Sequence, residues 1–146
     1  MHNFDGVGDK SALITLPVLG DERGKLVVAE SGAEILSRFD RVFWIYGTDK
    51  KVIRGMHANR KSEFVLFCVA GSCSVKVYEV DGSSQVFDLN SPEIGLYLPA
   101  MTWKEMLNFS PDSVLIVLSS ERYDPDEYIR DWDEWKRTAG GAVSTC

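Results

Sequence analysis

The feature that most constrains the fold of this chain is a succession of short apolar segments separated by turn residues. Each segment has strand length, is rich in β-branched and aromatic residues, and is bounded by glycine, proline, aspartate or serine. The segments cover residues 12–18, 24–30, 41–47, 63–71, 73–80, 84–89, 94–99, 103–109 and 113–120. Many short strands at near-regular spacing predict a β-sandwich or a β-barrel.

The apolar pattern within these segments indicates which faces are buried. In residues 73–80, Val75 and Val77 alternate with Ser74 and Lys76, so one face should lie in a core and the other toward water or ligand. Residues 113–120 are apolar almost throughout, as expected for a central strand covered on both faces. We therefore expect an all-β fold, specifically a small jelly-roll barrel, which holds ligands in its mouth or lumen.

One segment, residues 124–137, predicts a helix at the C-terminal end of the barrel. Asp124 is a suitable N-cap, Pro125 suits the first helical position, and Glu127 completes a capping-box-like pattern. An apolar stripe on this helix should pack on the barrel or on a partner subunit. The stripe consists of Tyr128, Ile129, Trp132 and Trp135.

The remaining segments suggest a single domain over residues 1–146, with a core from about 12 to 137. Residues 31–39 are expected to add a helical turn. Residues 138–146 have the small-residue composition of a loose, flexible tail.

Composition and charge exclude several classes of function. The net charge is −6 and no lysine-rich block is present, which argues against a nucleic-acid partner. A local arginine cluster is still compatible with a small anionic ligand. The sequence has no signal-peptide pattern at its start and no apolar run of membrane-spanning length, so we expect a cytoplasmic protein without a membrane partner. Cys68, Cys73 and Cys146 lack close CxxC spacing and are expected to be free thiols.

His57 precedes an apolar strand segment and is a candidate metal ligand, catalytic base or ordinary edge residue. A metal-binding cupin would supply His-x-His, a nearby Glu or Gln, and a later His. This chain supplies His57, Asn59 and Glu63, then Lys104 where a later His is expected, with Asn108 at the remaining place of the motif. A neutral amide and an ammonium group replace two ligands, and the lysine charge disfavours a divalent cation. We expect neither a metal nor another cofactor.

The surroundings of His57 favour a ligand site over a purely structural histidine. Arg23, Arg41 and Arg54 lie at the starts of strand segments or in their entry turns, and arginine suits phosphate and carbonyl oxygens. Aromatic residues available to stack on a base or sugar are Phe43, Trp44, Tyr46, Tyr97 and Trp103. Together these residues predict a pocket for a nucleotide-linked ligand.

Three stretches, "RGMHANRKSEFVLFCVAGSCSV", "SPEIGLYLPAMTWKEM" and "VLSSERYDPDEYIRDWDEW", resemble the dTDP-4-dehydro-6-deoxyglucose 3,4-ketoisomerases, or WxcM-like cupins. The similarity runs from about Asp21 to Trp135, and the tyrosine- and aspartate-rich end is its most specific part. The resemblance implies a metal-independent small cupin, typically a homodimer. It also implies an enzyme that acts on a dTDP-linked 4-keto-6-deoxyhexose in making 3-amino-3,6-dideoxy sugars.

The resemblance further implies roles for the candidate residues. Moving the ketone from C4 to C3 requires removal of the C3 proton, an enediol, and return of a proton at C4, and His57 would be the base. Arg41 and Arg54 would contact the diphosphate or sugar oxygens, and Tyr46 and Tyr97 would supply a hydroxyl or stacking surface. Arg23 resembles the branch of the family that gives the galacto-configured 3-keto product.

Two residues depart from the family pattern. Characterised members carry a second histidine where this chain has Asn59, and an amide cannot shuttle a proton at neutral pH. Lys104 stands where His or Arg is common. Three explanations remain open: a subgroup that uses His57 with Lys104 or a tyrosine, an engineered substitution, or a lost or altered activity. The candidate catalytic residues are His57, Asn59, Arg23 and Tyr46, and the candidate substrate-binding residues are Arg41, Arg54, Lys104, Tyr97, Trp103 and Glu63.

Two other functions compete with the ketoisomerase. A dTDP-sugar 3,5-epimerase would also use a histidine base, but it needs an aspartate partner for that histidine, and the sequence shows no clear one. A non-catalytic dTDP-sugar binding domain is compatible with Asn59.

Overall fold

The computed structural model describes residues 10–32 and 35–144, and nearly all of the regular structure is β. The elements are β1 (Ala12–Thr15), β2 (Val18–Asp21), β3 (Gly24–Val27), β4 (Arg41–Tyr46), β5 (Arg54–Asn59), β6 (Phe64–Ala70), β7 (Cys73–Tyr78), β8 (Ser84–Leu89), β9 (Ile94–Leu98), β10 (Trp103–Leu107), β11 (Val114–Ser119), the 3₁₀ turn η1 (Pro125–Glu127), β12 (Tyr128–Ile129) and α1 (Trp132–Ser144). The prediction of an all-β fold with a C-terminal helix is confirmed.

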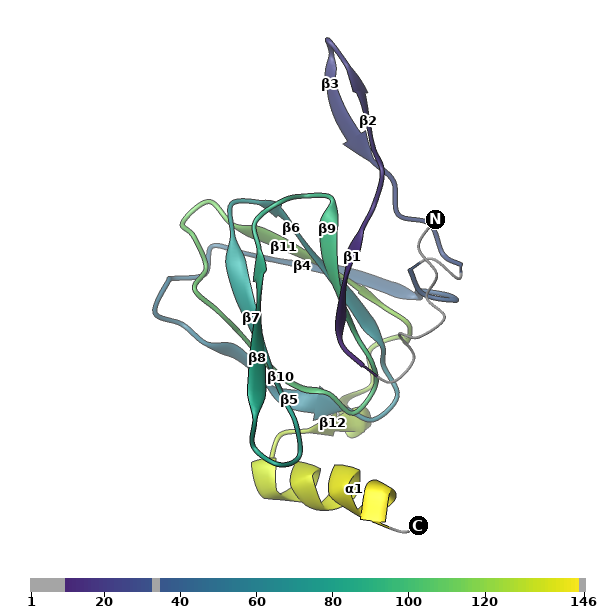
Figure 1. Ribbon diagram of the computed structural model, residues 1–146, viewed down its shortest axis with the longest axis vertical. Coiled ribbons are helices and arrows are strands. Elements are labelled where there is room, and N and C mark those ends of the chain that lie inside the picture. The colour runs from purple at the N-terminus through teal and green to yellow at the C-terminus, as the bar shows by residue number, and fades with distance from the viewer. Residues whose placement is uncertain (1–9, 33–34, 145–146) are drawn as a thin grey trace.

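Two five-stranded antiparallel sheets face each other (Figure 1), in the orders β1-β9-β6-β11-β4 and β12-β5-β10-β7-β8. Alternate residues of each strand point into the space between them, as the pleat requires. Leu66, Val75, Leu96 and Leu115 are among the buried residues that fill this space. The sheets are separate hydrogen-bonded units that pack on each other as a sandwich.

The apolar strand over residues 113–120 lies where its composition predicts. As β11 it pairs with β4 on one side and β6 on the other. Leu115 and Val117 face the core between the sheets, whereas Leu118 faces a second apolar cluster that includes Ile14 and Ile35. Both faces of β11 are therefore covered.

The prediction of a helix over 124–137 is confirmed for residues 132–137, which belong to α1, and is wrong for 124–131. The Asp124 side chain does act as an N-cap, accepting from the Asp126 amide at 3.0 Å, but it caps only the short turn η1. The chain then pairs with the edge of β5 as β12, where Ile129 is buried, and α1 begins at Trp132. Pairing with an open strand edge satisfies the backbone groups of this segment and outweighs local helix propensity.

The expected tail and helical turn also differ from the structure. Residues 138–144 continue α1, so they are helical, while 145–146 lie outside the described residues. The described part of 31–39 forms bends instead of a helical turn, with the Gly32 amide bonded to the Leu36 carbonyl at 2.6 Å; residues 33–34 lie outside the described range. No helix among the described residues is long and apolar enough to cross a membrane.

The helix α1 packs across the second sheet through an aromatic cluster. The Trp132 ring lies 5.1 Å from Tyr78 and 5.2 Å from Trp103, both edge-on. The Trp135 indole nitrogen donates to the Met101 carbonyl at 2.8 Å. This packing of α1 on the second sheet holds β12 against β5.

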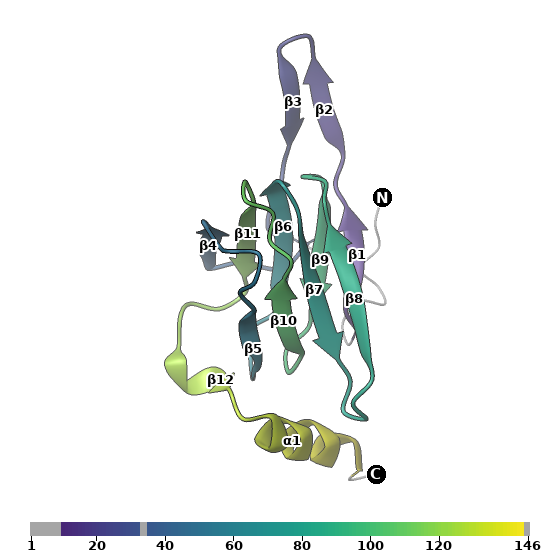
Figure 2. The same cartoon turned by 90° about the vertical axis from the view of Figure 1, so that its left-hand side faces the viewer.

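The hairpin of β2 and β3 projects from one end of the sandwich, opposite to α1 (Figures 1 and 2). Residues 12–18 were predicted as one strand, but they divide between β1 in the first sheet and the start of β2 in the hairpin. Large apolar side chains on the hairpin are exposed, including Leu19 (55 %) and Leu26 (54 %).

Candidate active site

A cavity of about 410 Å³ lies between the two sheets at the ends of β4, β5 and β10. Its lining, here called the His57 cavity, consists of Phe43, Ile45, Val52, Ile53, Arg54, Gly55, His57, Phe64, Leu66, Leu98, Lys104, Met106, Val117 and Tyr128. Most of these side chains are apolar, and the polar groups are few and convergent. That combination is typical of a site that binds and orients a small molecule.

A β-bulge beside the cavity sets the direction of His57. In the ladder between β5 and β10, Lys104 pairs with His57 and Glu105 with Gly55, so Met56 is an extra residue. Gly55 and Met56 both have positive φ, at 87° and 55°. A non-glycine residue in this region costs about 1–3 kcal/mol and is typically retained where it serves a site.

The bulge also fixes the tautomer of His57. Its Nδ1 lies 2.9 Å from the Gly55 carbonyl oxygen, which can only accept, so Nδ1 carries the hydrogen and Nε2 keeps its lone pair. Burial, followed by the charge of Lys104, lowers the pKa of His57 to about 4. The ring packs on Tyr128 with 4.9 Å between centroids. Asn59 interacts with the ring as well and partly opposes this lowering of the pKa. His57 is therefore a neutral imidazole at pH 7, with its basic lone pair on Nε2.

Lys104 is buried in the same cavity, with 5 % of its surface exposed. Its ammonium donates to Asn59 Oδ1 at 2.9 Å and lies 4.7 Å from the centre of the Phe64 ring. Burial lowers the pKa of Lys104 to about 7, against the opposing effect of Glu127. The two residues that depart from the family pattern, Asn59 and Lys104, are thus direct partners.

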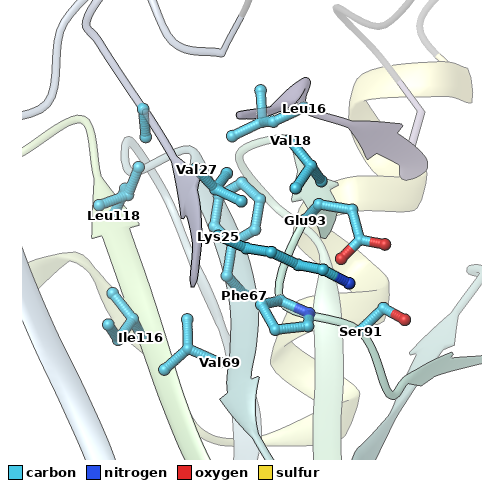
Figure 3. Close-up of a pocket in the computed structure, with 12 residues that line it drawn as sticks. Leu16, Val18, Lys25, Val27, Phe67, Val69, Ser91, Glu93, Ile116 and Leu118 are labelled. Atoms are coloured by element: carbon cyan, nitrogen blue, oxygen red, sulfur yellow. The ribbon is translucent and has the colours of Figure 1, made fainter. Parts of the chain in front are cut away.

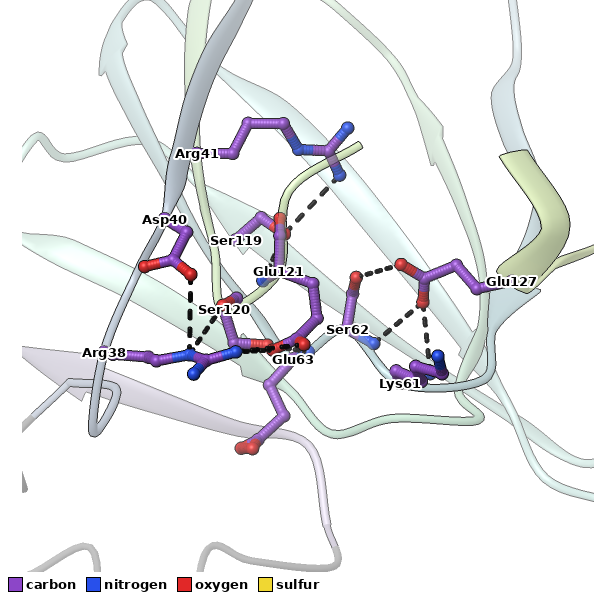
Figure 4. Close-up of polar contacts among 10 residues, drawn as sticks. All are labelled: Arg38, Asp40, Arg41, Lys61, Ser62, Glu63, Ser119, Ser120, Glu121 and Glu127. Atoms are coloured by element: carbon purple, nitrogen blue, oxygen red, sulfur yellow. Dashed lines mark hydrogen bonds and ion pairs between the residues drawn. The ribbon is translucent and has the colours of Figure 1, made fainter. Parts of the chain in front are cut away.

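Glu127 is a buried carboxylate next to the β5–β12 pair. It accepts from the Lys61 amide at 3.1 Å and from the Ser62 amide and hydroxyl at 2.8 and 2.5 Å (Figure 4). Burial raises the pKa of Glu127, but these hydrogen bonds outweigh it and hold the pKa below its usual value. A permanent negative charge therefore lies near the Lys104 ammonium and stabilises it.

Arg41 lies next to Phe43, one of the residues that line the His57 cavity. It shares a face of β4 with Phe43, and its guanidinium lies 5.1 Å from that ring and 5.6 Å from Tyr123. Its Nη2 donates to the Ser119 hydroxyl at 3.4 Å (Figure 4). Its Nε is buried without a hydrogen-bond partner among the described residues, so it can still donate to an anion.

Three of the predicted substrate-binding residues lie away from this cavity. Tyr97 faces the other side of its sheet, and its hydroxyl donates to the Glu63 carboxylate at 2.8 Å. Figure 4 shows the Glu63 carboxylate directed away from Glu127. Trp103 is buried beneath α1. The alternation of β9 and β10 places Tyr97 and Trp103 opposite to their neighbours Leu98 and Lys104, which do line the cavity.

Two predicted catalytic residues are also distant from His57 within one copy of the chain. Tyr46 points outward from β4 and is 68 % exposed. Arg23 lies at the hairpin tip, where its side chain is 85 % exposed and bonded to Asp21 at 2.6 Å. The residues that the structure brings together are Arg54, His57 and Lys104, with Asn59 bonded to Lys104 and Arg41 next to the lining residue Phe43.

Sequence reasoning missed Tyr128 and Arg130 as members of the site. Tyr128 was assigned to a helical stripe, but β12 places its ring against His57 in the cavity. Arg130 lies 4.6 Å over the Tyr128 ring, and its charge contributes to the lowered pKa of His57. The β-forming pair Tyr128-Ile129 was the available signal for a strand.

A second hollow of about 680 Å³ lies between the hairpin and the outward face of the first sheet (Figure 3). This outer groove is lined by Leu16, Val18, Lys25, Val27, Ala29, Phe67, Val69, Ser91, Pro92, Glu93, Ile116 and Leu118. It is larger than the His57 cavity, and its charged lining residues are Lys25 and Glu93.

Comparisons with known proteins show the family of this chain. The family model described as "FdtA: WxcM-like, C-terminal" matches residues 9–140. The TDP-4-oxo-6-deoxy-alpha-D-glucose-3,4-oxoisomerase of Aneurinibacillus thermoaerophilus is 38 % identical over 128 residues, covering 88 % of this chain and 91 % of that protein.

Solved structures give the same result. A 3,4-ketoisomerase from Helicobacter canadensis superposes with a TM-score of 0.85 at 34 % identity, over 90 % of this chain and 98 % of that one. A mutant of the 3,4-ketoisomerase QdtA from Thermoanaerobacterium thermosaccharolyticum, solved with TDP-4-keto-6-deoxyglucose, gives 0.87 at 33 % identity, over 92 % and 96 %. The family model, the sequence identity and the shared fold agree, and the chain belongs to the FdtA, WxcM-like family.

Proposed function

We propose that this protein is a nucleotide-sugar 3,4-ketoisomerase that converts dTDP-4-keto-6-deoxyglucose into a dTDP-3-keto-6-deoxyhexose. The observation that carries the proposal is the neutral His57 imidazole in a largely apolar cavity, where the bond from Nδ1 to the Gly55 carbonyl leaves the lone pair on Nε2. A base of this kind suits removal of a proton from the carbon beside a ketone.

The cavity supplies the other elements of the reaction. Cations near the base favour the negative charge that develops on the sugar oxygens in the enediol-like transition state. Arg54 and Lys104 line the cavity and Arg41 packs on the lining residue Phe43, in a chain of net charge −6. We assign Arg41 and Arg54 to the diphosphate and sugar oxygens, because arginine offers planar pairs of donors to such groups.

The geometry of His57 disfavours the epimerase alternative. An epimerase of the expected type needs a carboxylate partner on its histidine. Here Nδ1 of His57 is bonded to a backbone carbonyl of its own strand.

Proton NMR in deuterated water tests the proposal and its alternatives. With dTDP-4-keto-6-deoxyglucose, the isomerase should move the ketone and place deuterium at the C3/C4 centres. Deuterium at C3 and C5 without ketone transfer would identify an epimerase. Binding of dTDP without any exchange would identify a binding domain.

We also propose that the protein works as a homodimer. Leu19 and Leu26 are exposed on the projecting hairpin, and the outer groove beside it is apolar. Exposed apolar surfaces of this kind are typical of association sites. In a dimer, Arg23 at the hairpin tip of one copy would act in the His57 cavity of the other copy.

Subunit complementation tests this arrangement. Arg23→Ala and His57→Asn should each abolish most activity. Equilibrating the two inactive variants together should restore part of it, because a mixed dimer holds one cavity with both native residues. Failure to restore activity in a verified mixed dimer would remove Arg23 from the site. A monomeric mass by light scattering would contradict the dimer itself.

A further inference from the structure

The proposed reaction moves two protons, and His57 can account for only one at a time. One proton leaves C3 and arrives at C4. A second must reach the C4 oxygen as the enediol forms and leave the C3 oxygen as the new ketone forms. With its pKa near 4, His57 is a base at neutral pH, so it has no proton to give to that oxygen first.

Few side chains in the cavity can carry the oxygen proton. The titratable groups in the described lining, apart from His57, are Arg54, Lys104 and Tyr128. Arginine remains protonated at any relevant pH and cannot release a proton. Tyr128 packs its ring on His57. Lys104 is left as the strongest candidate, with Tyr128 as the alternative to be tested.

The backbone holds Lys104 beside the base. Lys104 and His57 are cross-strand partners at the β-bulge, and both side chains line the cavity. The Lys104 ammonium is held by Asn59 Oδ1 at 2.9 Å, an acceptor that cannot itself take the proton. One hydrogen bond satisfies only one of its three N–H donors, which leaves donors for a substrate oxygen.

We propose that Lys104 is a second catalytic residue, the general acid–base that carries the oxygen proton between O4 and O3 of the sugar. The assignment rests on the proposed ketoisomerase function. His57 Nε2 takes the C3 proton, the C–H electron pair forms the C3–C4 double bond, and O4 receives a proton from Lys104. The neutral Lys104 then takes the O3 proton, the C3 carbonyl forms, and C4 receives the proton held on His57. No oxidant or reductant is consumed.

The groups around Lys104 and His57 determine the pH range in which the pair can act as acid and base. His57 and Asn59 of β5 and Glu127 of η1 interact with it, while Tyr128 and Arg130 contact or influence His57. Burial lowers the pKa values of His57 and Lys104 to about 4 and about 7. Between these values His57 is a free base and Lys104 a charged acid, a separation typical of acid–base pairs. The kcat/KM should therefore rise through pH 4 and fall above pH 7.

Substitutions of Lys104 distinguish a role in proton transfer from a role as a positive charge alone. Lys104→Arg keeps a cation but cannot release a proton, so kcat should fall about 100-fold or more at every pH while dTDP affinity stays near that of the wild type. Lys104→Ala should be equally slow and should recover activity when ethylamine is added. Lys76 of β7 points to the opposite face of the same sheet, where it lies over Tyr78, so Lys76→Arg and Lys76→Ala are matched controls.

Each outcome decides the assignment. A near-normal kcat in Lys104→Arg, without the fall of kcat/KM above pH 7, would show that only the positive charge is needed. That result would overturn the proposal. A larger loss in Tyr128→Phe than in Lys104→Ala, with no amine rescue, would give the role to Tyr128 instead. If the wild type itself fails to move the ketone, the proposed function fails first. Circular dichroism and dTDP binding confirm that each variant folds.

Discussion

The His57 cavity and the outer groove lie on opposite faces of the sheet formed by β1, β9, β6, β11 and β4. The outer groove has the greater volume, about 680 against 410 Å³, and a lining that is mostly aliphatic. The His57 cavity gathers an imidazole, a buried ammonium and a guanidinium, and burial has shifted the pKa of the first two. Perturbed titratable groups are a better indication of chemistry than volume is.

The largest expected effect belongs to the base of the His57 cavity. His57→Asn should reduce ketone transfer by about 10²–10⁴-fold, because an amide cannot accept the C3 proton at neutral pH. Affinity for dTDP, measured by calorimetry, should change little. A variant that loses binding instead would make His57 a positioning residue.

Lys104 should make the stability of the fold depend on alkaline pH. Its pKa is lowered to about 7 from 10.5, so between these values the unfolded chain binds more protons and stability rises with pH. The limiting slope is about 1.4 kcal/mol per pH unit for one proton. Denaturant unfolding from pH 7 to 10 should show this rise in the wild type and lack it in Lys104→Met. Parallel profiles would mean that folding does not lower the pKa of Lys104.

The bulge beside His57 should be sensitive to a single methyl group. A Cβ at Gly55 would lie 3.0 Å from the Lys104 carbonyl oxygen in a residue with φ of 87°. We expect Gly55→Ala to cost about 1–3 kcal/mol of stability and to lower kcat by displacing His57. Gly82→Ala, at a hairpin glycine with φ of 91° and open space around its Cα, is a control for the backbone effect alone. Equal losses of activity in both variants would argue against a special role for the bulge.

The smallest effect is expected in the outer groove. Val69 lines it and is partly exposed, so Val69→Thr should change stability by no more than about 0.5 kcal/mol. Steady-state kinetics should give a kcat/KM within about twofold of the wild type. A tenfold loss of kcat/KM without dissociation of the dimer would show that the outer groove takes part in catalysis. The contrast between the outer groove and the His57 cavity would then be lost.

Local patterns predicted the sheets of this fold better than its site. The apolar stretch of β11 and the alternation of β7 reflect burial on one or two faces, a property that sequence carries directly. β5 was missed as a strand because Gly55 and the polar pair His57 and Asn59 interrupt its apolar pattern. That interruption is the bulge that makes the site.

The candidate site residues show the same difference between what local sequence carries and what the folded arrangement decides. His57, Arg54 and Lys104 were found because their chemistry is visible in the sequence, and the cavity contains all three. Tyr97 is a candidate by residue type alone, but strand parity turns it to the opposite face, where its hydroxyl donates to Glu63, the residue before β6. Tyr128 was missed because η1 and β12 form through pairing with β5, a contact between residues about 70 positions apart that no local pattern contains.

The most direct test of the account is a crystal structure of the His57→Asn variant with dTDP-4-keto-6-deoxyglucose. We expect the sugar in the His57 cavity, with C3 facing residue 57, the C4 oxygen within about 3.2 Å of Lys104 Nζ, and the diphosphate toward Arg41 or Arg54. A sugar bound in the outer groove, or one whose C3 and C4 oxygen face away from residues 57 and 104, would contradict it.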